Sequence, residues 1–224
     1  MDTPVRRPVN TLHPSLVHSQ SNQSFIMAHK FLDLAFTPEV LAAQEHYYGR
    51  SQVLPPATRD DPLGQDEIGF IQSRDSFYLS SVSETGWPYI QHRGGPQGFA
   101  KVISPNEIAF ADYKGNRQML STGNLAVNDR VCLFLMDYPQ RVRLKILGHA
   151  EVLDARAHPD LVEKIAAPEM VRLTERIFKI RIVSYDWNCP KYITPRYTAA
   201  EVTELVAPLK ARIAELESQL QKHP

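Results

Sequence analysis

The sequence predicts a mainly β protein of the α+β class, an antiparallel Greek-key barrel with peripheral helices and a C-terminal helix. Residues 75–184 divide into short runs that are rich in aromatic and β-branched residues and are separated by Gly, Pro and Asn, as in antiparallel strands and turns. Helices do not alternate regularly with these runs, which argues against a parallel sheet. Residues 199–221 carry apolar side chains at three- and four-residue spacing, the pattern of an amphipathic helix.

Seven strands follow from this pattern. They are predicted at residues 76–82, 88–92, 98–103, 107–113, 130–137, 141–153 and 175–184. The segments 84–86 and 104–106 hold the Gly, Pro and Asn residues that reverse a chain. So many antiparallel strands in one domain favour a closed or partly closed barrel.

Helices are predicted around the strands. Residues 37–49 begin with Thr37 as N-cap and Pro38 at the first helical position and end at Gly49, which is how a helix starts and stops. Further helices are expected at 65–73, 117–122 and 159–166, and the proline-rich residues 54–62 are expected to form a loop. In the terminal helix, we expect Pro208 to introduce a kink or a break.

The composition limits the classes of protein. The 224 residues include 25 Lys and Arg against 25 Asp and Glu, so the chain lacks the basic excess that binds nucleic acids or anionic membranes. Apolar runs such as 131–136 are too short to cross a bilayer. Cys132 and Cys189 form no Cys-x-x-Cys pair, which predicts a reducing, cytoplasmic setting without structural zinc. Cys189 has no second thiol nearby and no basic neighbour before Lys191, so a redox role is not favoured.

Three segments are expected along the chain. Residues 1–26 are rich in Pro, Ser, His, Asn and Gln and form a disordered leader, or precede a natural start at Met27. They lack the amphipathic Arg-rich pattern of a transit peptide. Residues 27–198 form the barrel domain with its N-terminal helices, and residues 199–224 form the C-terminal helix.

A short basic turn stands between a predicted strand and a predicted helix. It reads Lys114-Gly-Asn-Arg-Gln118. If Asn116 caps the helix and Gly115 adopts an unusual backbone angle, the first helical amides point outwards and bind a phosphate together with Arg117. The alternative is a solvated turn in which the basic residues only add solubility.

Polar residues also gather at a neighbouring strand end. Gln91, His92 and Arg93 end one predicted strand and Lys101 lies on the next, and such donors are costly to bury without a polar ligand. Basic residues alternate with apolar ones over 141–146, which fits either a site or a solvated outer face. These groups together suit a flat, phosphorylated cofactor better than a metal or a nucleic acid. His92 is the best candidate for an acid or base, and a structural histidine is the competing interpretation.

The order of these motifs resembles the pyridoxamine 5'-phosphate oxidase-related family of FMN-binding split barrels. The resemblance covers about residues 70–197 and rests on Phe-Ala-Asp-Tyr-Lys-Gly-Asn-Arg-Gln, Asn-Asp-Arg-Val-Cys-Leu-Phe-Leu and Arg-Leu-Lys-Ile-Leu-Gly-His-Ala-Glu-Val. It is closest to an uncharacterised branch with Gly-Asn-Arg-Gln and Asp-Trp-Asn-Cys-Pro. It implies an FMN-binding flavoprotein that acts as an oxidoreductase on an unidentified small molecule. It also implies a homodimer with the flavin at the subunit interface.

The resemblance assigns roles to individual positions. It implies that Asn116, Arg117 and Gln118, where the family has Ser-Arg-Lys, hold the FMN phosphate, and that Arg143 contacts the cofactor of the partner subunit. The other implied cofactor-binding residues are Gln91, His92, Arg93, Lys101, Ala111, Asp112, Tyr113 and Trp187.

Two departures from the family pattern bear on which substrate is expected. Gln118 replaces a lysine, and the segment after Trp187 lacks the Arg-x-His pair that binds the substrate phosphate in the oxidase proper. Pyridoxamine phosphate is therefore not assigned as the substrate. The alternatives are a deazaflavin-dependent reductase on the same barrel and a non-catalytic protein that binds flavin or haem.

Overall fold

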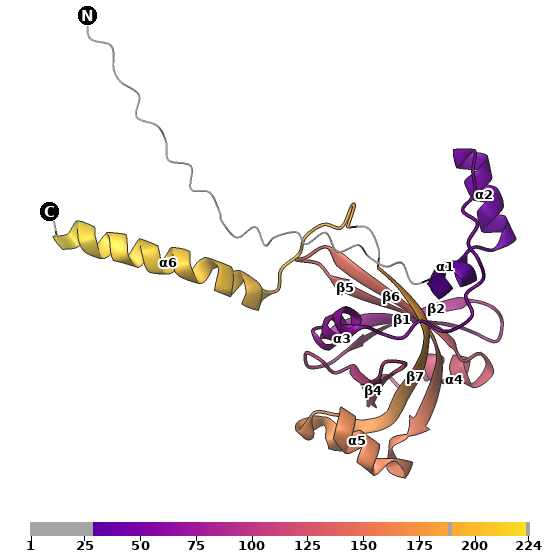
Figure 1. Ribbon diagram of the computed structural model, residues 1–224. Helices are drawn as coiled ribbons and strands as arrows, with labels where there is room; N and C mark the ends of the chain where they lie inside the picture. The colour runs from indigo at the N-terminus through magenta and orange to yellow at the C-terminus, as the bar shows by residue number, and fades with distance from the viewer. Residues whose placement is uncertain (1–28, 188–189, 223–224) are drawn as a thin grey trace, which may run out of the picture.

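The sheet contains seven antiparallel strands. The computed structural model describes residues 29–187 and 190–222, so the predicted leader and Cys189 lie outside the described residues. The strand order is β2-β1-β5-β6-β7-β4-β3 (Figure 1). The strands are β1 (Ser76–Val82), β2 (Pro88–Gly94), β3 (Lys101–Ser104), β4 (Glu107–Tyr113), β5 (Arg130–Asp137), β6 (Val142–Asp154) and β7 (Thr174–Trp187). The predicted mainly β fold is confirmed.

The two edge strands of the sheet are consecutive in the chain. Residues 95–100 alone connect β2 to β3, so the sheet must curl until its edges approach each other. In the part of the chain that the structure describes, β2 pairs with β1 and β3 pairs with β4, and no ladder joins β2 to β3. A curled sheet with one unpaired seam is a split barrel.

The barrel is filled by side chains that alternate inwards along the strands. Its centre is aromatic: Phe77 and Phe99 stack with ring centroids 5.3 Å apart, and Phe110 and Phe178 stack at 5.1 Å. Leucines and isoleucines of β1, β5, β6 and β7 surround these rings and are almost fully buried. The core therefore sits inside the curled sheet.

Strand β4 is buried on both faces. Ile108 and Phe110 belong to the barrel core, whereas Ala109 and Ala111 pack in a second cluster with helix α5 (Pro159–Ile165). Because side chains alternate along a strand, Ala111 faces α5 and its neighbour Asp112 faces the barrel side. This alternation turns Asp112, and not Ala111, towards the pocket described below.

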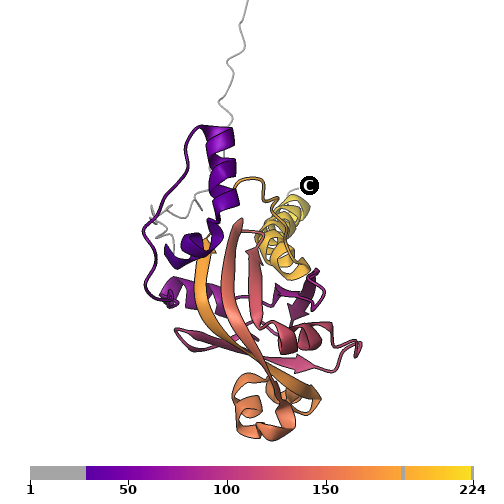
Figure 2. The same ribbon diagram turned by 90° about the vertical axis from the view of Figure 1, so that its right-hand side faces the viewer.

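The first two helices, α1 and α2, and helix α5 lie at opposite ends of the sheet, as both views show (Figures 1 and 2). Helix α1 (His29–Ala35) was not predicted, and it lies beside β6 and β7, where the Phe31 ring centroid is 4.9 Å from Lys145 Nζ. Helix α2 (Pro38–Tyr48) has the predicted Thr37 cap, which accepts from the amide of Val40. Helix α3 (Gln65–Gln72) also follows the prediction.

Several elements differ from the prediction: β2 and β7 are longer than predicted, and α4, β3 and α6 differ as follows. Helix α4 (Leu120–Val127) begins three residues after the predicted start at Arg117. Strand β3 loses its first predicted residues because Gly98 is left-handed, with φ of 74°, and its amide donates to the carbonyl of Arg74 in a turn. Helix α6 (Ala199–Lys222) runs through the exposed Pro208, so of the predicted kink or break the break is wrong, and the kink stays a prediction.

Two short 3-10 helices, Ala155–Ala157 and Pro168–Leu173, flank α5. Across residues 29–187 and 190–222, no helix has both the length and the apolar character needed to cross a membrane.

Candidate functional site

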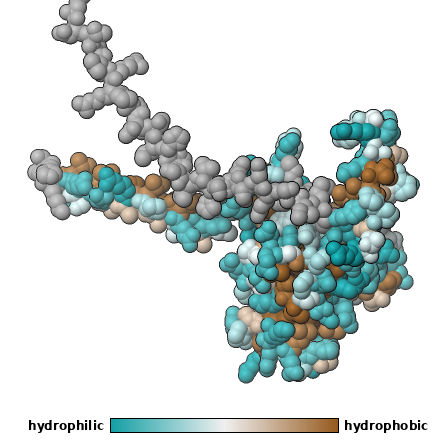
Figure 3. All heavy atoms as spheres, in the orientation of Figure 1, coloured by the Kyte–Doolittle hydropathy of each residue, from teal (hydrophilic) through white to brown (hydrophobic). Residues whose placement is uncertain are grey.

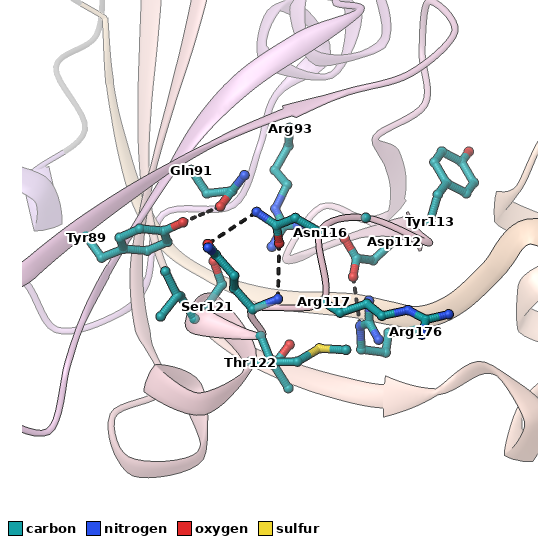
Figure 4. Close-up of a pocket in the computed structure, with 14 residues that line it drawn as sticks. Tyr89, Gln91, Arg93, Asp112, Tyr113, Asn116, Arg117, Ser121, Thr122 and Arg176 are labelled. Atoms are coloured by element: carbon teal, nitrogen blue, oxygen red, sulfur yellow. Dashed lines mark hydrogen bonds and ion pairs between the residues drawn. The ribbon is translucent and has the colours of Figure 1, made fainter.

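A pocket of about 190 Å³ opens where β2, β4, β7 and the start of α4 meet (Figure 4). It contains seven of the residues that the sequence singled out: Gln91, Arg93, Asp112, Tyr113, Asn116, Arg117 and Gln118. The other lining residues are Tyr89, Gly115, Met119, Leu120, Ser121, Thr122 and Arg176. The predicted polar turn and the predicted polar strand end are therefore neighbours in space.

Strand β2 sends alternate side chains to this pocket. Tyr89, Gln91 and Arg93 are half-buried and line it, whereas Ile90 and His92 are exposed on the other face of the strand. The Tyr89 hydroxyl donates to Gln91 Oε1. The His92 ring instead meets the edge of Tyr78, with centroids 5.7 Å apart. The two-residue period of a strand thus separates His92 from the two neighbours with which it was grouped.

Two arginines share one carboxylate at the base of the pocket. Arg93 Nη1 donates to Asp112 Oδ1, and Arg176 Nε donates to Asp112 Oδ2 at 2.8 Å. The three side chains are between 11 and 17% exposed. Burial lowers the pKa of Arg93; the nearby Asp112 carboxylate opposes this change, and Arg176 adds to it. The Arg93 guanidinium also lies over the ring of Phe178, 4.6 Å from its centroid, and is held firmly.

The turn before α4 differs from the predicted helix cap. Asn116 Oδ1 accepts from the amide of Gln118 at 3.1 Å, and Asn116 Nδ2 donates to Gln118 Oε1 at 3.2 Å. This local turn occupies the Asn116 side chain, and the helix begins only at Leu120. The unusual backbone angle predicted for Gly115 occurs instead at Arg117 (φ 62°) and Met119 (φ 58°).

Several donors at and beside the start of α4 have no hydrogen-bond partner among the residues that the structure describes. The first intrahelical bond runs from the amide of Gly123 to the carbonyl of Met119 at 2.8 Å, so the amides of residues 120–122 have no acceptor within the helix. Ser121 Oγ and Arg93 Nε are buried and, within residues 29–187 and 190–222, have no hydrogen-bond partner. Buried polar atoms are nearly always paired, so these atoms indicate a ligand that accepts hydrogen bonds.

The pocket carries an excess of positive charge. Arg93, Arg117 and Arg176 line it against the single carboxylate of Asp112. Glu175, which lies outside the lining, offsets one of these charges through its ion pair with Arg176 Nη1 at 3.1 Å. A local positive site in a chain of no net charge favours an anion.

A phosphorylated cofactor fits these residues. Unpaired helix-start amides, a buried hydroxyl and an exposed arginine form the donor set that phosphate prefers. The cavity is smaller than the roughly 300–1,000 Å³ of most small-molecule sites, so it holds only part of such a cofactor. At its rim, Met119 and Leu120 are 41 and 45% exposed and offer an apolar surface.

Other predicted site residues lie elsewhere. Ala111 packs on α5, and Lys101, at the start of β3, does not line the pocket. Arg143 lies over the ring of Phe134, 6.0 Å from its centroid, and its buried Nε has no partner within the described residues. Trp187 Nε1 donates to Glu67 Oε1 of α3 at 2.5 Å. A single chain therefore leaves these residues outside its own pocket.

Sequence reasoning missed six of the pocket residues, and three of these, Tyr89, Ser121 and Arg176, bear on the polar contacts of the pocket. Tyr89 has a sequence signal, because it stands two residues before Gln91 and must share its face. Arg176 reaches Asp112 through the cross-strand register of β4 and β7, which the sequence does not show. Ser121 was placed inside the predicted helix rather than in its first turn.

Metal ligands do not gather in the part of the chain that the structure describes. No group of three or more His, Cys, Asp or Glu side chains there is placed to hold a metal ion.

The fold and the pocket define the class of the protein: a split barrel with a positively charged pocket beside its edge strand. The chain belongs to the pyridoxamine 5'-phosphate oxidase family, because the family model with that description matches residues 68–185, more than half of the chain. No curated protein matches the chain.

Solved structures with a similar barrel have low sequence identity to the chain. A putative pyridoxamine 5'-phosphate oxidase from Lactobacillus delbrueckii is 17% identical, with a TM-score of 0.44, over 57% of this chain and 96% of the other. General Stress Protein 26 from Bacillus anthracis is 16% identical, with a TM-score of 0.40, over 53% and 88%. An FMN-binding protein from Syntrophomonas wolfei is 13% identical, with a TM-score of 0.39, over 55% and 83%.

Proposed function

We propose that this protein is an FMN-binding flavoprotein that oxidises or reduces a small molecule. The observation that carries the proposal is the pair of buried, unpartnered donors, Ser121 Oγ and Arg93 Nε, in a pocket with excess positive charge. FMN is a phosphorylated cofactor with hydrogen-bond acceptors along its length, and the family assignment supports it. When bound, FMN supplies the redox chemistry.

In this proposal the chain's own residues bind and orient the cofactor. The amides of residues 120–122, Ser121 Oγ and Arg117 bind the phosphate as charge-assisted and dipole-oriented donors. Gln91 and Tyr89 provide neutral polar contacts beside it. Arg93 and Arg176, fixed by Asp112, provide a positive environment that favours an electron-rich cofactor.

The active form in this proposal is a homodimer with the flavin at the subunit interface. The pocket of one chain is too small for the whole cofactor, and its rim carries the exposed apolar side chains of Met119 and Leu120. Arg143, with its unpaired Nε on the outer side of the sheet, is proposed to reach the partner's cofactor. His92 is exposed on the face of β2 that points away from the pocket. It could therefore act as the proposed acid or base only in a site that a second subunit completes.

The deciding experiment identifies the cofactor. The purified protein is denatured and the released molecule is identified by mass spectrometry; FMN is expected, and a deazaflavin, haem or no cofactor after incubation with FMN would contradict the proposal. Riboflavin is the matched control ligand, because it lacks only the phosphate. We expect FMN to bind at least about tenfold more tightly than riboflavin, since charge-assisted bonds to phosphate contribute about 1.5–3 kcal/mol. Equal affinities would contradict the phosphate assignment.

Turnover is tested separately. Anaerobic reduction of the bound flavin by a nicotinamide, followed by reoxidation with oxygen, would support an oxidoreductase with an unidentified small-molecule substrate. A flavin that neither nicotinamides nor other donors reduce would indicate a carrier rather than an enzyme.

A further inference from the structure

Helix α6 extends away from the barrel and leaves an apolar stripe uncovered (Figures 1 and 3). A capping box begins it, because the Thr198 amide donates to Glu201 Oε2 at 2.7 Å and the Glu201 amide donates to Thr198 Oγ1 at 3.2 Å. From Val202 to Gln221, every residue except Val206 is exposed. Most of the stability of a helix in a protein comes from packing of its apolar face, so a partner surface is expected along the stripe.

The stripe follows a strict heptad. The apolar residues Val202, Val206, Leu209, Ile213, Leu216 and Leu220 are spaced alternately four and three residues apart. In heptad terms Val206 and Ile213 occupy the two central a positions and Leu209 and Leu216 the two central d positions, while Val202 at d and Leu220 at a stand at the ends of the stripe. β-Branched residues at a with leucine at d favour two parallel strands over higher oligomers. Pro208 takes a c position, on the side away from the seam.

The charges beside the seam favour the same arrangement. Arg212 is at a g position and Glu217 is at the e position five residues later, and these positions face each other across a parallel dimer. Two helices related by twofold symmetry would therefore form this attractive pair twice. Within one helix, Arg212 Nη1 pairs with Glu215 Oε2 at 2.6 Å, and both side chains are more than half exposed and free to rearrange.

The second pair of g and e positions, Leu205 and Lys210, is also compatible with a parallel dimer. Leu205 at g is 59% exposed, and Lys210 at e would cover it with its aliphatic stem while its charge stays in water. No like charges meet across this seam in the parallel register.

We propose that α6 pairs with α6 of a second copy of this chain in a parallel, in-register, two-stranded coiled coil. The pairing goes beyond the proposed function, and it does not depend on flavin binding. It brings the same end of two barrels together about a twofold axis.

Cysteine cross-linking in the full chain tests the pairing and its direction. Cys132 and Cys189 are replaced by serine, and Leu216→Cys is compared with Ser218→Cys under mild oxidation. Leu216 lies at d, where its symmetry mate is adjacent in a parallel coil, and Ser218 lies at f, on the outside. We expect a disulfide-linked dimer from the first variant and roughly a tenth of that yield or less from the second. No link at Leu216, or equal links at both, would overturn the proposal.

The charge pair gives a second test, in which the only change to the apolar stripe is the cysteine used for cross-linking. In the chain carrying Leu209→Cys, Glu217→Arg is expected to lower the cross-linking yield about threefold, because it places like charges together. The swap Arg212→Glu with Glu217→Arg is expected to restore the yield. A yield unchanged by the single reversal, or not restored by the swap, would contradict the parallel register.

A matched pair of double variants separates the coil from the barrel. Ile213→Asp with Leu216→Asp is expected to abolish cross-linking through Leu209→Cys, whereas Ala214→Asp with Ser218→Asp, on the outer face, is expected to leave it unchanged. FMN binding by these variants is measured separately. Cross-linking without FMN binding would support the coiled coil and contradict the proposed function. FMN binding without cross-linking through Leu209→Cys would support the proposed function and contradict the coiled coil.

Discussion

Arg93 on the edge strand β2 and Asp112 on β4 form an ion pair between two strands that share no backbone ladder. Asp112 also holds Arg176 of β7, so one carboxylate ties three strands together at the pocket. This carboxylate is therefore expected to matter for stability as well as for the charge of the site.

Asp112→Ala should destabilise the protein by about 3 kcal/mol, because it leaves two largely buried guanidinium groups without their shared counter-charge. Urea unfolding of the cofactor-free protein measures this change. Asp60→Ala is the control, since it removes an exposed ion pair with Arg181 and should change the free energy of unfolding by less than about 1 kcal/mol. An equal loss in both variants would argue against a special role for Asp112.

Arg117→Ala should weaken FMN binding by about 1.5–3 kcal/mol, since it removes a charged donor to the phosphate. Lys114→Ala is the matched control, because Lys114 is an exposed cation of the same turn that does not line the pocket. Isothermal titration with FMN and riboflavin compares the two. If both variants weaken FMN binding equally, the loss reflects the general positive potential of the turn rather than a bond from Arg117 to the phosphate. The interpretation of Arg117 as part of a solvated turn would then hold.

Ser121→Ala should have opposite effects on stability and binding. The hydroxyl is buried without a partner, so its removal is expected to leave the cofactor-free protein as stable or up to about 1 kcal/mol more stable. The same change should weaken FMN binding by about 1 kcal/mol, because the phosphate loses a donor. Thermal unfolding with and without FMN measures both quantities; a loss of stability without FMN would show that the hydroxyl has a structural partner.

Deprotonation of Tyr185 should lower the stability of the folded protein in alkaline solution. Burial, together with the carboxylates of Glu67 and Asp61, raises the pKa of Tyr185 to about 12. Since the folded state holds this proton more tightly than the unfolded chain, the contribution is complete below about pH 10 and is lost as the pH rises towards 12. Urea midpoints between about pH 9 and pH 11 should fall less steeply in Tyr185→Phe than in the wild type. Parallel slopes would contradict the assignment.

Much of the fold follows from local pattern. Strands β1, β4 and β5 have the predicted bounds because alternation and turn residues mark both of their ends. The start of α4 was misplaced because Asn116 has two competing uses, a helix cap or a local turn, and the sequence does not rank them. The break expected at Pro208 did not occur, since one helix continues through it.

The site was predictable to the extent that it is local. The turn at 114–118 and the polar residues of β2 were found from their types and order, but the grouping of His92 with Arg93 ignored the two-residue period of a strand. Arg176 was missed because its pairing with Asp112 depends on the register between β4 and β7. Long-range register is set by how the whole sheet curls, and no short segment contains that information.

The unpaired seam has a consequence for the exchange of amide hydrogens with solvent. Within residues 29–187 and 190–222, strand β2 pairs only with β1, so it can detach by breaking a single ladder and the Arg93 to Asp112 contact. Its amides should therefore exchange with deuterium before those of the central strands β6 and β7, and a ligand that fills the pocket should slow them most. Local opening of the barrel is therefore expected to begin at β2, and Arg93, which helps to form the pocket, also opposes this opening through its ion pair with Asp112.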